Sequence, residues 1–405
     1  MEKRDIYLEQ LKKAKDKNQI KVITGVRRCG KSTLLNLFAE YLYESGVETD
    51  AVIEINFELM QFDDIHDYKE LYGIIEEKRN PKKRTYLLLD EVGRVDGWEK
   101  TVASLQADKK VDVDIYITGS NATLLSSELS TLLGGRYLEV HMLPLSFSEY
   151  LDFLSDGAGT TEDAYFDYTM YGGFPGIFEM NRDENLIRSF LDGIYHSILI
   201  KDVVSRNQVR DVDLLERVLR FVANNIGNQV SAKNISGYLT GMGRKASHET
   251  VDNYLHMLTE AFIIYKARNF DIKRKQLLAN LGKYYFVDIG MRNYLSGQKG
   301  EALGGVLENQ VYAELLFRGY QVSVGKIGEL EVDFVAEKNG AISYYQVTST
   351  MADQETRERE LRPFKLIKDN YPKFIVSADR TPFRDYDGIT QINIRDFLEG
   401  GGPGD

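Results

Sequence analysis

The sequence has little of what marks a secreted, membrane-spanning or zinc-binding protein. It contains a single cysteine, Cys29, so no disulfide can form within the chain. No stretch approaches the roughly 18 to 20 apolar residues of a membrane helix, and the charged N-terminus lacks the apolar core of a signal peptide. His66, His141 and His196 lack the spacing of zinc ligands. We therefore expect a cytoplasmic protein with no membrane partner.

The composition indicates a folded chain with several domains. Hydrophobic residues make up 43% and charged residues 28% of the 405 residues, which is typical of globular proteins. At about 150 residues per domain, this length predicts roughly two or three domains. The net charge of -11 argues against a uniformly basic nucleic-acid-binding surface but allows a local basic patch.

Strand and helix patterns alternate over the first 145 residues. A charged helical pattern at residues 6–17 comes first. Apolar runs at residues 20–24, 51–57, 85–90 and 113–118 are then separated by helical patterns at residues 31–43, 68–77 and 98–106. Alternation of this kind predicts an α/β fold with a parallel sheet covered by helices.

A phosphate-binding motif follows the first of these strands. Residues 25–32, GVRRCGKS, fit the pattern G-x-x-x-x-G-K-[ST] between a predicted strand and a predicted helix. Backbone amides of such a loop face the phosphates of ATP at the positive end of the helix, the lysine reaches the β- and γ-phosphates, and the serine binds Mg²⁺. The predicted ATP-binding residues are Gly25, Val26, Arg27, Arg28, Cys29, Gly30, Lys31, Ser32 and Thr33.

Polar side chains follow two further strands. The apolar run at residues 87–89 ends in Asp90 and Glu91; we expect Asp90 to hold Mg²⁺ through water and Glu91 to orient the attacking water. The strand at residues 113–118 is followed by Ser120 and Asn121, either of which can sense the γ-phosphate. A helix N-cap is an equally good interpretation of these two residues.

An arginine in a glycine-rich loop is the last candidate for the ATP site. Arg136 follows Gly134 and Gly135. It can stabilise the transition state in its own subunit or in a neighbouring subunit of a homo-oligomer. The alternative is a solvated surface arginine.

The pattern changes after residue 145. Residues 147–206 show helical patterns interrupted by GGFP at residues 172–175, and residues 211–275 show three short helical patterns followed by a β-like run and Lys273-Arg274-Lys275. A third α/β pattern begins at residue 303. The predicted organisation is an ATPase core (1–145), a helical lid (146–208), a winged helix-turn-helix (209–285), a C-terminal α/β domain (286–399) and a flexible tail (400–405).

Several motifs, in order, resemble those of a known family. They are GVRRCGKSTLL, LLLDEV, IYITGSNATLLSSELSTLLGGRY, LPLSFSEYL, YGGFP and KYYFVDIGMRN. They are similar to motifs of bacterial and archaeal AAA-type ATPases whose C-terminal domain is related to PD-(D/E)XK nucleases. The resemblance implies a sensor at Asn121 and an arginine finger at Arg136. Gly93 stands where the family often has glutamine, which puts glutamine-mediated coupling in question.

The C-terminal residues contain part of a nuclease pattern. PD-(D/E)XK sites need a carboxylate on a helix, another on a strand, and an acidic or amide group on the next strand, so that oxygen ligands hold divalent ions. Glu308 lies in the predicted helix, Glu331 and Asp333 share one face of a predicted strand, and Gln346 takes the third position.

The lysine of that pattern is replaced. Thr348 stands two residues after Gln346, and a threonine cannot supply the positive charge that polarises the attacking water. Lys365 or Lys368 on the following helix is an alternative source. We therefore predict a degenerate site, at Glu308, Asp333, Gln346 and Thr348, in a domain that binds and does not cut.

The predicted winged helix carries a local excess of positive charge. Residues 231–275 hold eight lysines or arginines against four acidic residues, which suits phosphate binding. The expected recognition helix at residues 247–260 exposes Glu249 and Glu260, so DNA contact would rely on the β-hairpin. The hairpin residues are Lys266, Arg268, Lys273, Arg274 and Lys275. A protein-interaction module is an equally good interpretation.

Three functions are consistent with these patterns. The first is an ATPase whose nucleotide state, with Mg²⁺, acts on a DNA-associated winged-helix and nuclease-like module. The second is an ATP-regulated, magnesium-dependent nuclease. The third is a nucleotide-dependent switch that binds a protein partner.

Overall fold

The computed structural model describes residues 4–125, 135–154, 159–297, 303–380 and 384–401, so Gly134 and the predicted tail from residue 402 lie outside the described residues. The chain divides into two compact units. Unit 1 is Met1–Leu143 with Glu260–Phe262, and unit 2 is Pro144–Thr259 with Ile263–Asp405. Within the described ranges, no helix combines the length and apolarity needed to cross a membrane.

Unit 1 contains a five-stranded parallel sheet in the order β2-β3-β4-β1-β5. Its strands are β1 (Ile20–Thr24), β2 (Val52–Asn56), β3 (Thr85–Asp90), β4 (Val113–Gly119) and β5 (Tyr137–His141). The predicted parallel α/β sheet is confirmed. Because all the strands run the same way, their carboxyl ends share one edge, and β4 lies between β1 and β3. This order brings the residues that follow β1, β3 and β4 to adjacent positions.

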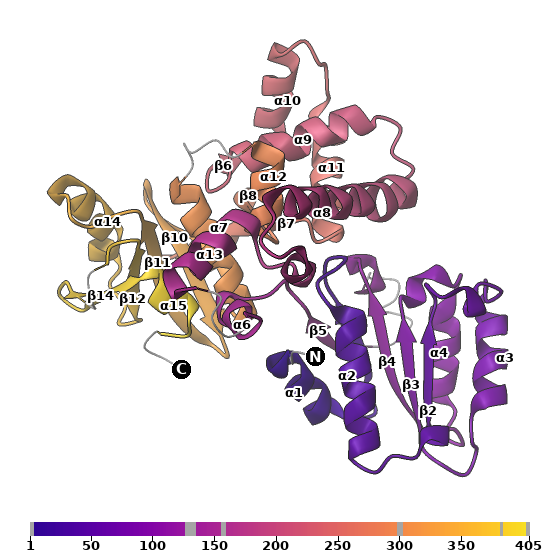
Figure 1. The fold of residues 1–405 in the computed structure, drawn as a ribbon. Helices are drawn as coiled ribbons and strands as arrows, with labels where there is room; N and C mark the ends of the chain where they lie inside the picture. Colours follow the sequence, from indigo (N-terminus) through magenta and orange to yellow (C-terminus); the bar gives the residue numbers. More distant parts are fainter. Residues whose placement is uncertain (1–3, 126–134, 155–158, 298–302, 381–383, 402–405) are drawn as a thin grey trace. The chain divides into compact units, whose positions relative to one another are not determined.

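Helices cover both faces of this sheet. They are α1 (Asp5–Ala14), α2 (Lys31–Glu44), α3 (Tyr68–Lys78) and α4 (Trp98–Ala107), with short 3-10 turns η1 (Thr49–Ala51), η2 (Met60–Phe62), η3 (Val92–Arg94) and η4 (Ala122–Leu125). Leu71 and Ile75 of α3 and Val102 and Leu105 of α4 share one apolar core with the strands. Right-handed crossovers place α2, which connects β1 to β2, on the opposite face, where it packs with α1 (Figure 1).

Unit 2 begins with helices, as the sequence predicted. They are α6 (Phe147–Asp152), α7 (Thr161–Tyr171), η5 (Pro175–Met180), α8 (Glu184–Ser197), the π-helical η6 (Ile198–Ser205), α9 (Val212–Asn224), α10 (Ala232–Gly241) and α11 (His248–Glu260). Later helices are α12 (Ile289–Ser296), α13 (Leu303–Phe317), α14 (Gln354–Leu366) and α15 (Ile394–Leu398).

A nine-stranded sheet completes unit 2, in the order β13-β14-β12-β11-β10-β9-β7-β8-β6. The strands are β6 (Gln229–Val230), β7 (Ile264–Asp271), β8 (Gln276–Phe286), β9 (Gln321–Ile327), β10 (Leu330–Lys338), β11 (Ala341–Thr348), β12 (Lys373–Ser377), β13 (Arg384–Asp385) and β14 (Ile389–Asn393). The β7–β8 hairpin joins the later strands because β7 pairs in parallel with β9. The sheet therefore runs across the predicted boundary at residues 285/286, and the predicted winged-helix and C-terminal domains share it.

Candidate functional site

The loop between β1 and α2 requires glycine at two positions. Gly25 has φ 144° and Gly30 has φ 105°, both outside the range that other residues favour. A Cβ on Gly25 would lie 2.1 Å from the carbonyl oxygen of Met142, which directly follows β5. The amide of Met142 donates to the carbonyl of Thr24 at 2.8 Å. The backbone after β5 therefore fixes the path of the phosphate-binding loop.

The loop holds its lysine close to the acidic strand end. The Nζ of Lys31 donates to the carbonyl oxygens of Gly25 at 3.0 Å and Val26 at 3.2 Å. It lies 3.9 Å from the Oε1 of Glu91. Lys31 is buried, as is Asp90 beside Glu91. The predicted residues of both motifs thus lie together at the carboxyl edge of the sheet.

A threonine on the central strand connects the two acids. The hydroxyl of Thr118 donates to Oδ1 of Asp90 and accepts from the backbone amide of Glu91 at 2.8 Å. Glu91 adopts a left-handed conformation with φ 54°, which turns the chain at the strand end. Burial raises the pKa of Glu91, although the nearby charge of Lys31 opposes the shift. Sequence reasoning missed Thr118, whose position at the end of β4 was the available signal.

The other predicted residues of the loop differ in exposure. Ser32 and Thr33 are half-buried in the first turn of α2, whereas the side chain of Cys29 is fully buried. Burial raises the pKa of the Cys29 thiol. The guanidinium of Arg27 pairs with Glu58 at 3.2 Å, and Arg94 of η3 pairs with the same carboxylate at 3.1 Å. Glu58 therefore bridges the phosphate-binding loop and the turn after Glu91.

The candidate sensor and the candidate arginine finger lie at different edges of the sheet. Ser120 and Asn121 are buried directly after β4, at the carboxyl edge. Arg136 precedes β5, whose first residue pairs with Ile20 and whose last pairs with Thr24. Arg136 therefore lies at the amino edge, and five residues of strand, about 16 Å, separate the two edges. Action of Arg136 on the ATP site of its own chain is thereby excluded, and action on a neighbouring subunit stays a prediction.

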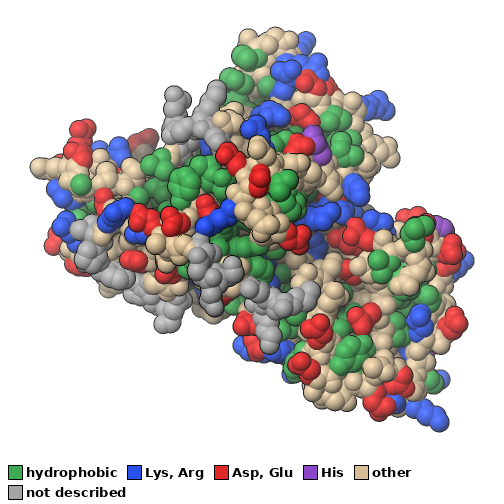
Figure 2. All heavy atoms as spheres, viewed as in Figure 1, with side chains coloured by type: hydrophobic (Ala, Val, Ile, Leu, Met, Phe, Trp, Pro, Cys, Tyr) green, Lys and Arg blue, Asp and Glu red, His purple; other side chains and the backbone are tan. Residues whose placement is uncertain are grey.

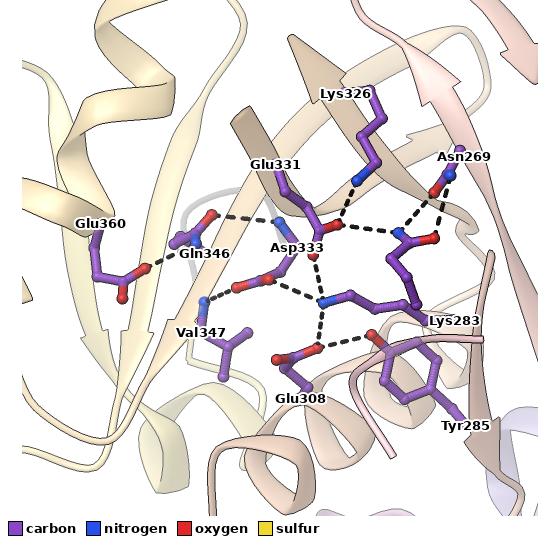
Figure 3. A network of polar contacts seen from close by, with 11 residues as sticks. Asn269, Lys283, Tyr285, Glu308, Lys326, Glu331, Asp333, Gln346, Val347 and Glu360 are labelled. Carbon is purple, nitrogen blue, oxygen red and sulfur yellow. Dashed lines mark hydrogen bonds and ion pairs between the residues drawn. The ribbon is translucent and has the colours of Figure 1, made fainter. Parts of the chain in front are cut away.

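In unit 2, four charged side chains converge as Figure 3 shows. The buried Nζ of Lys283, from β8, lies 2.8 Å from Oε2 of Glu308 on α13, 2.7 Å from Oε1 of Glu331 and 3.3 Å from Oδ1 of Asp333, both on β10. Tyr285 also donates to Glu308, at 2.9 Å. We call Lys283, Glu308, Glu331 and Asp333 the carboxylate cluster.

The cluster is strongly coupled electrostatically. Burial and the Asp333 carboxylate raise the pKa of Glu308 to about 8. Burial also raises the pKa of Asp333. For Glu331, burial raises the pKa, but the charge of Lys283 outweighs burial and the net shift is downward. For Lys283, burial lowers the pKa, but the three carboxylates outweigh burial and the net shift is upward. Lys283 is therefore charged, and the carboxylates compete for it.

The cluster contains an ammonium group that the sequence analysis does not predict, that of Lys283. Lys365 and Lys368 are exposed, and Lys283 supplies the ammonium group. Gln346 accepts from the amide of Asp333 at 3.3 Å. The hydroxyl of Thr348 donates to the carbonyl of Thr350 at 3.3 Å. A lysine inside an aromatic strand, KYYF at residues 283–286, was the available signal.

The predicted basic hairpin is exposed. Lys266 and Arg268 lie on one face of β7, and Lys273, Arg274 and Lys275 form the turn to β8. On α11, the predicted buried face is confirmed at Val251, Tyr254, Leu255 and Leu258. Over the visible face of unit 1, in contrast, acidic and basic side chains are interspersed (Figure 2).

Comparison with known proteins identifies the first unit. Residues 17–151 match a family described as an AAA domain, and residues 162–302 match a domain of unknown function (DUF8612). The fold is similar to that of the Walker-type ATPase paby2304 of Pyrococcus abyssi, with a TM-score of 0.54 at 16% identity, covering 73% of this chain and 96% of that one. Both family matches end by residue 302, so the relation of the C-terminal residues to PD-(D/E)XK nucleases stays a prediction.

Two curated relatives match over most of the chain. An uncharacterized protein of Haemophilus influenzae is 39% identical over 398 residues, covering 98% of both chains. The uncharacterized protein MJ1544 of Methanocaldococcus jannaschii is 34% identical over 376 residues, covering 87% of this chain and 79% of that protein. With its AAA domain and P-loop fold, the chain belongs to the family that includes these two proteins.

Proposed function

We propose that the protein hydrolyses ATP with Mg²⁺ and that the nucleotide state acts on a DNA-associated module in unit 2. The observation that carries the ATPase proposal is the position of Lys31, which lies at the phosphate-binding loop and 3.9 Å from Glu91. A positive group for the phosphates and a carboxylate for the attacking water are thus adjacent, as phosphoryl transfer to water requires.

Each residue of the site has a distinct role in this proposal. The loop amides at residues 25–33 and Lys31 bind the phosphates of ATP. The hydroxyl of Ser32 and the carboxylate of Asp90 are hard oxygen donors that fit Mg²⁺ and would hold it; bound there, Mg²⁺ supplies positive charge to the phosphates. Glu91 orients water, and burial, which raises its pKa, makes it a stronger base than an exposed carboxylate. Asn121 senses the γ-phosphate.

The proposal includes a second copy of the chain because of the position of Arg136. Since Arg136 lies at the amino edge of its own sheet, it serves as an arginine finger only in trans. A homo-oligomer that presents Arg136 to the ATP site of a neighbour is therefore part of the proposal.

DNA association is proposed from the exposed basic hairpin. Three helices followed by the β7–β8 hairpin have the order of a winged helix, and five exposed lysines and arginines lie on that hairpin. Such a cluster suits phosphate contacts. A protein-docking hairpin is the competing interpretation. An ATP-regulated, magnesium-dependent nuclease is disfavoured, because the ammonium group of Lys283 lies among the three carboxylates that would bind the metal.

The deciding experiment measures ATP binding and turnover, with and without labelled DNA. We expect Lys31→Ala to lose most ATP binding. Glu91→Gln should bind ATP but turn it over about 10²–10⁴-fold more slowly, the usual contribution of a general base. Glu77→Gln, at an exposed position of α3, is the matched control. Unchanged turnover in Glu91→Gln would move the base elsewhere. The labelled DNA separates the three functions: binding without cleavage supports the DNA-associated ATPase, cleavage supports the nuclease, and neither supports the protein-binding switch.

A further inference from the structure

The Lys283 ammonium group occupies the centre of the carboxylate cluster. Its nitrogen lies between 2.7 and 3.3 Å from one oxygen of each of Glu308, Glu331 and Asp333, and Figure 3 shows the three side chains directed at it. An ammonium group has three N–H donors. Each donor therefore has one carboxylate acceptor, so the cluster is filled.

Two of the three remaining carboxylate oxygens accept hydrogen bonds from protein groups. Oδ2 of Asp333 accepts from the amide of Val347 at 2.9 Å. Oε2 of Glu331 accepts from Lys326 at 2.7 Å and from Gln229 at 3.0 Å. The amide nitrogen of Gln346 donates to Glu360 at 2.8 Å. Protein groups therefore orient the side chains of Asp333, Glu331 and Gln346.

A divalent ion does not fit this arrangement. Mg²⁺ and Ca²⁺ take six or more oxygen ligands at about 2.0–2.6 Å, and Lys283 stands where the three carboxylates meet. Among the residues that the structure describes, no group of three or more histidine, cysteine, aspartate or glutamate side chains has a geometry that could hold a metal ion. The metal that a nuclease-like fold implies thus disagrees with the side chains present.

Charge balance explains why a cation is needed at this position. Asp333 is buried and Glu308 keeps 14% of its side chain exposed, and an unpaired carboxylate in such a position is costly. Lys283 and Lys326 together oppose the three carboxylates. Lys326 contacts only Glu331 among the three, so Lys283 is the cation that serves Glu308 and Asp333.

We infer that Lys283 is a resident cation that takes the place of a divalent metal in this cluster. The cluster then binds no metal in the native protein, and it fastens the β7–β8 hairpin to β10 and α13. Removal of the ammonium group exposes a latent divalent site formed by Glu308, Glu331 and Asp333. The inference concerns the cluster alone and holds whether or not the hairpin binds DNA.

The test is Mn²⁺ binding by the full chain without nucleotide, measured by the electron paramagnetic resonance signal of free Mn²⁺. We expect the wild type and Asp333→Asn to bind equally, and Lys283→Met to gain one Mn²⁺ per chain and a Mn²⁺-dependent rise in Tm. The double variant Lys283→Met/Asp333→Asn should lose both. Lys326→Met, which removes the peripheral lysine, is the matched control and should gain nothing.

Two results would overturn the inference. The first is Mn²⁺ binding by the wild type that Asp333→Asn abolishes, since Lys283 would then make way for a metal. The second is a folded Lys283→Met that gains no site. If Lys283→Met does not fold, the comparison of Mn²⁺ binding by the wild type and by Asp333→Asn still shows whether the native cluster binds a metal. Mn²⁺ at the ATP site would instead be lost in Asp90→Asn, which separates this test from the proposed ATPase.

Discussion

Asp288 joins two motifs whose role the ATP site does not explain. Its carboxylate accepts from the amide of Gly173 in YGGFP at 2.7 Å and from the amide of Met291 in VDIGMRN at 2.9 Å. A Cβ on Gly172 would lie 2.2 Å from Oδ1 of Asp288, and one on Gly290 would lie 1.9 Å from the carbonyl of Tyr171. The glycines thus allow the two segments to close on a buried carboxyl group.

Burial of this group predicts a pH-dependent stability. Burial raises the pKa of Asp288 from 3.8 to about 6, although its backbone hydrogen bonds oppose the shift. The carboxyl group therefore stabilises the fold fully below its unfolded pKa, and this contribution is lost as the pH rises through about 6. The whole effect is about 3 kcal/mol, of which roughly 1.4 kcal/mol falls between about pH 5 and pH 7.5.

The variant Asp288→Asn isolates this effect because asparagine does not ionise. Its single amide oxygen cannot accept from both Gly173 and Met291, so the variant should be less stable at about pH 5, by roughly 1–3 kcal/mol. The stability difference should shrink by about 1.4 kcal/mol on going to about pH 7.5. Urea denaturation followed by circular dichroism measures both values, and hydrogen exchange at the Gly173 amide gives a local readout.

The control is Asp183→Asn at an exposed helix N-cap in the same unit, which removes the charge but keeps a capping oxygen. It should change the free energy of unfolding little, and without the same pH trend. A difference between wild type and Asp288→Asn that is equal at both pH values would refute the reasoning, because the buried carboxyl would then not titrate in this range.

Three further predictions address unit 1 and the hairpin. Arg136→Ala should lower ATP turnover without weakening nucleotide binding, and wild-type turnover per chain should rise with protein concentration. If Arg136→Ala leaves turnover unchanged and wild-type turnover does not depend on protein concentration, Arg136 is a surface arginine. Charge reversal at residues 273–275 should weaken DNA binding and flatten its salt dependence; an unchanged salt slope would favour protein docking. Lys21→Met leaves the buried Asp114 without its ion-pair partner and should lower the free energy of unfolding by about 3–5 kcal/mol. Urea denaturation followed by Trp98 fluorescence measures this change, and an unchanged unfolding midpoint would contradict the prediction.

The sequence predicts unit 1 well where strands are fully buried. The strand at Thr85–Asp90 coincides with the predicted run at residues 85–90, because every residue in it is buried and residues 86–89 form a continuous hydrophobic run. The strand at Tyr137–His141 was missed. It lies at the sheet edge, where only Val140 is buried, so it carries no apolar run. The position of Arg136 depends on that strand, and the sequence could not place it.

Unit 2 shows why motif spacing alone is insufficient. Glu308, Asp333 and Gln346 were recognisable, because they follow one another on a helix and two consecutive strands. Their partner Lys283 precedes all three, and it reaches them only because β7 pairs in parallel with β9 in the register that sets Asn269 opposite Val324. Register between distant strands is not encoded in local periodicity.

The same register explains how the predicted winged helix and C-terminal domain depend on each other. Gln229 of β6 donates to Asn269 of β7 at 3.0 Å and to Glu331 of β10 at 3.0 Å, and Lys283 of β8 pairs with the acids of α13 and β10. Division of the chain at residues 285/286 would separate the carboxylates of the cluster from Lys283, their cation. The carboxylate cluster is thus part of the structure that holds the basic hairpin, because Lys283 lies on β8 opposite Ala267 of β7, the strand that carries Lys266 and Arg268.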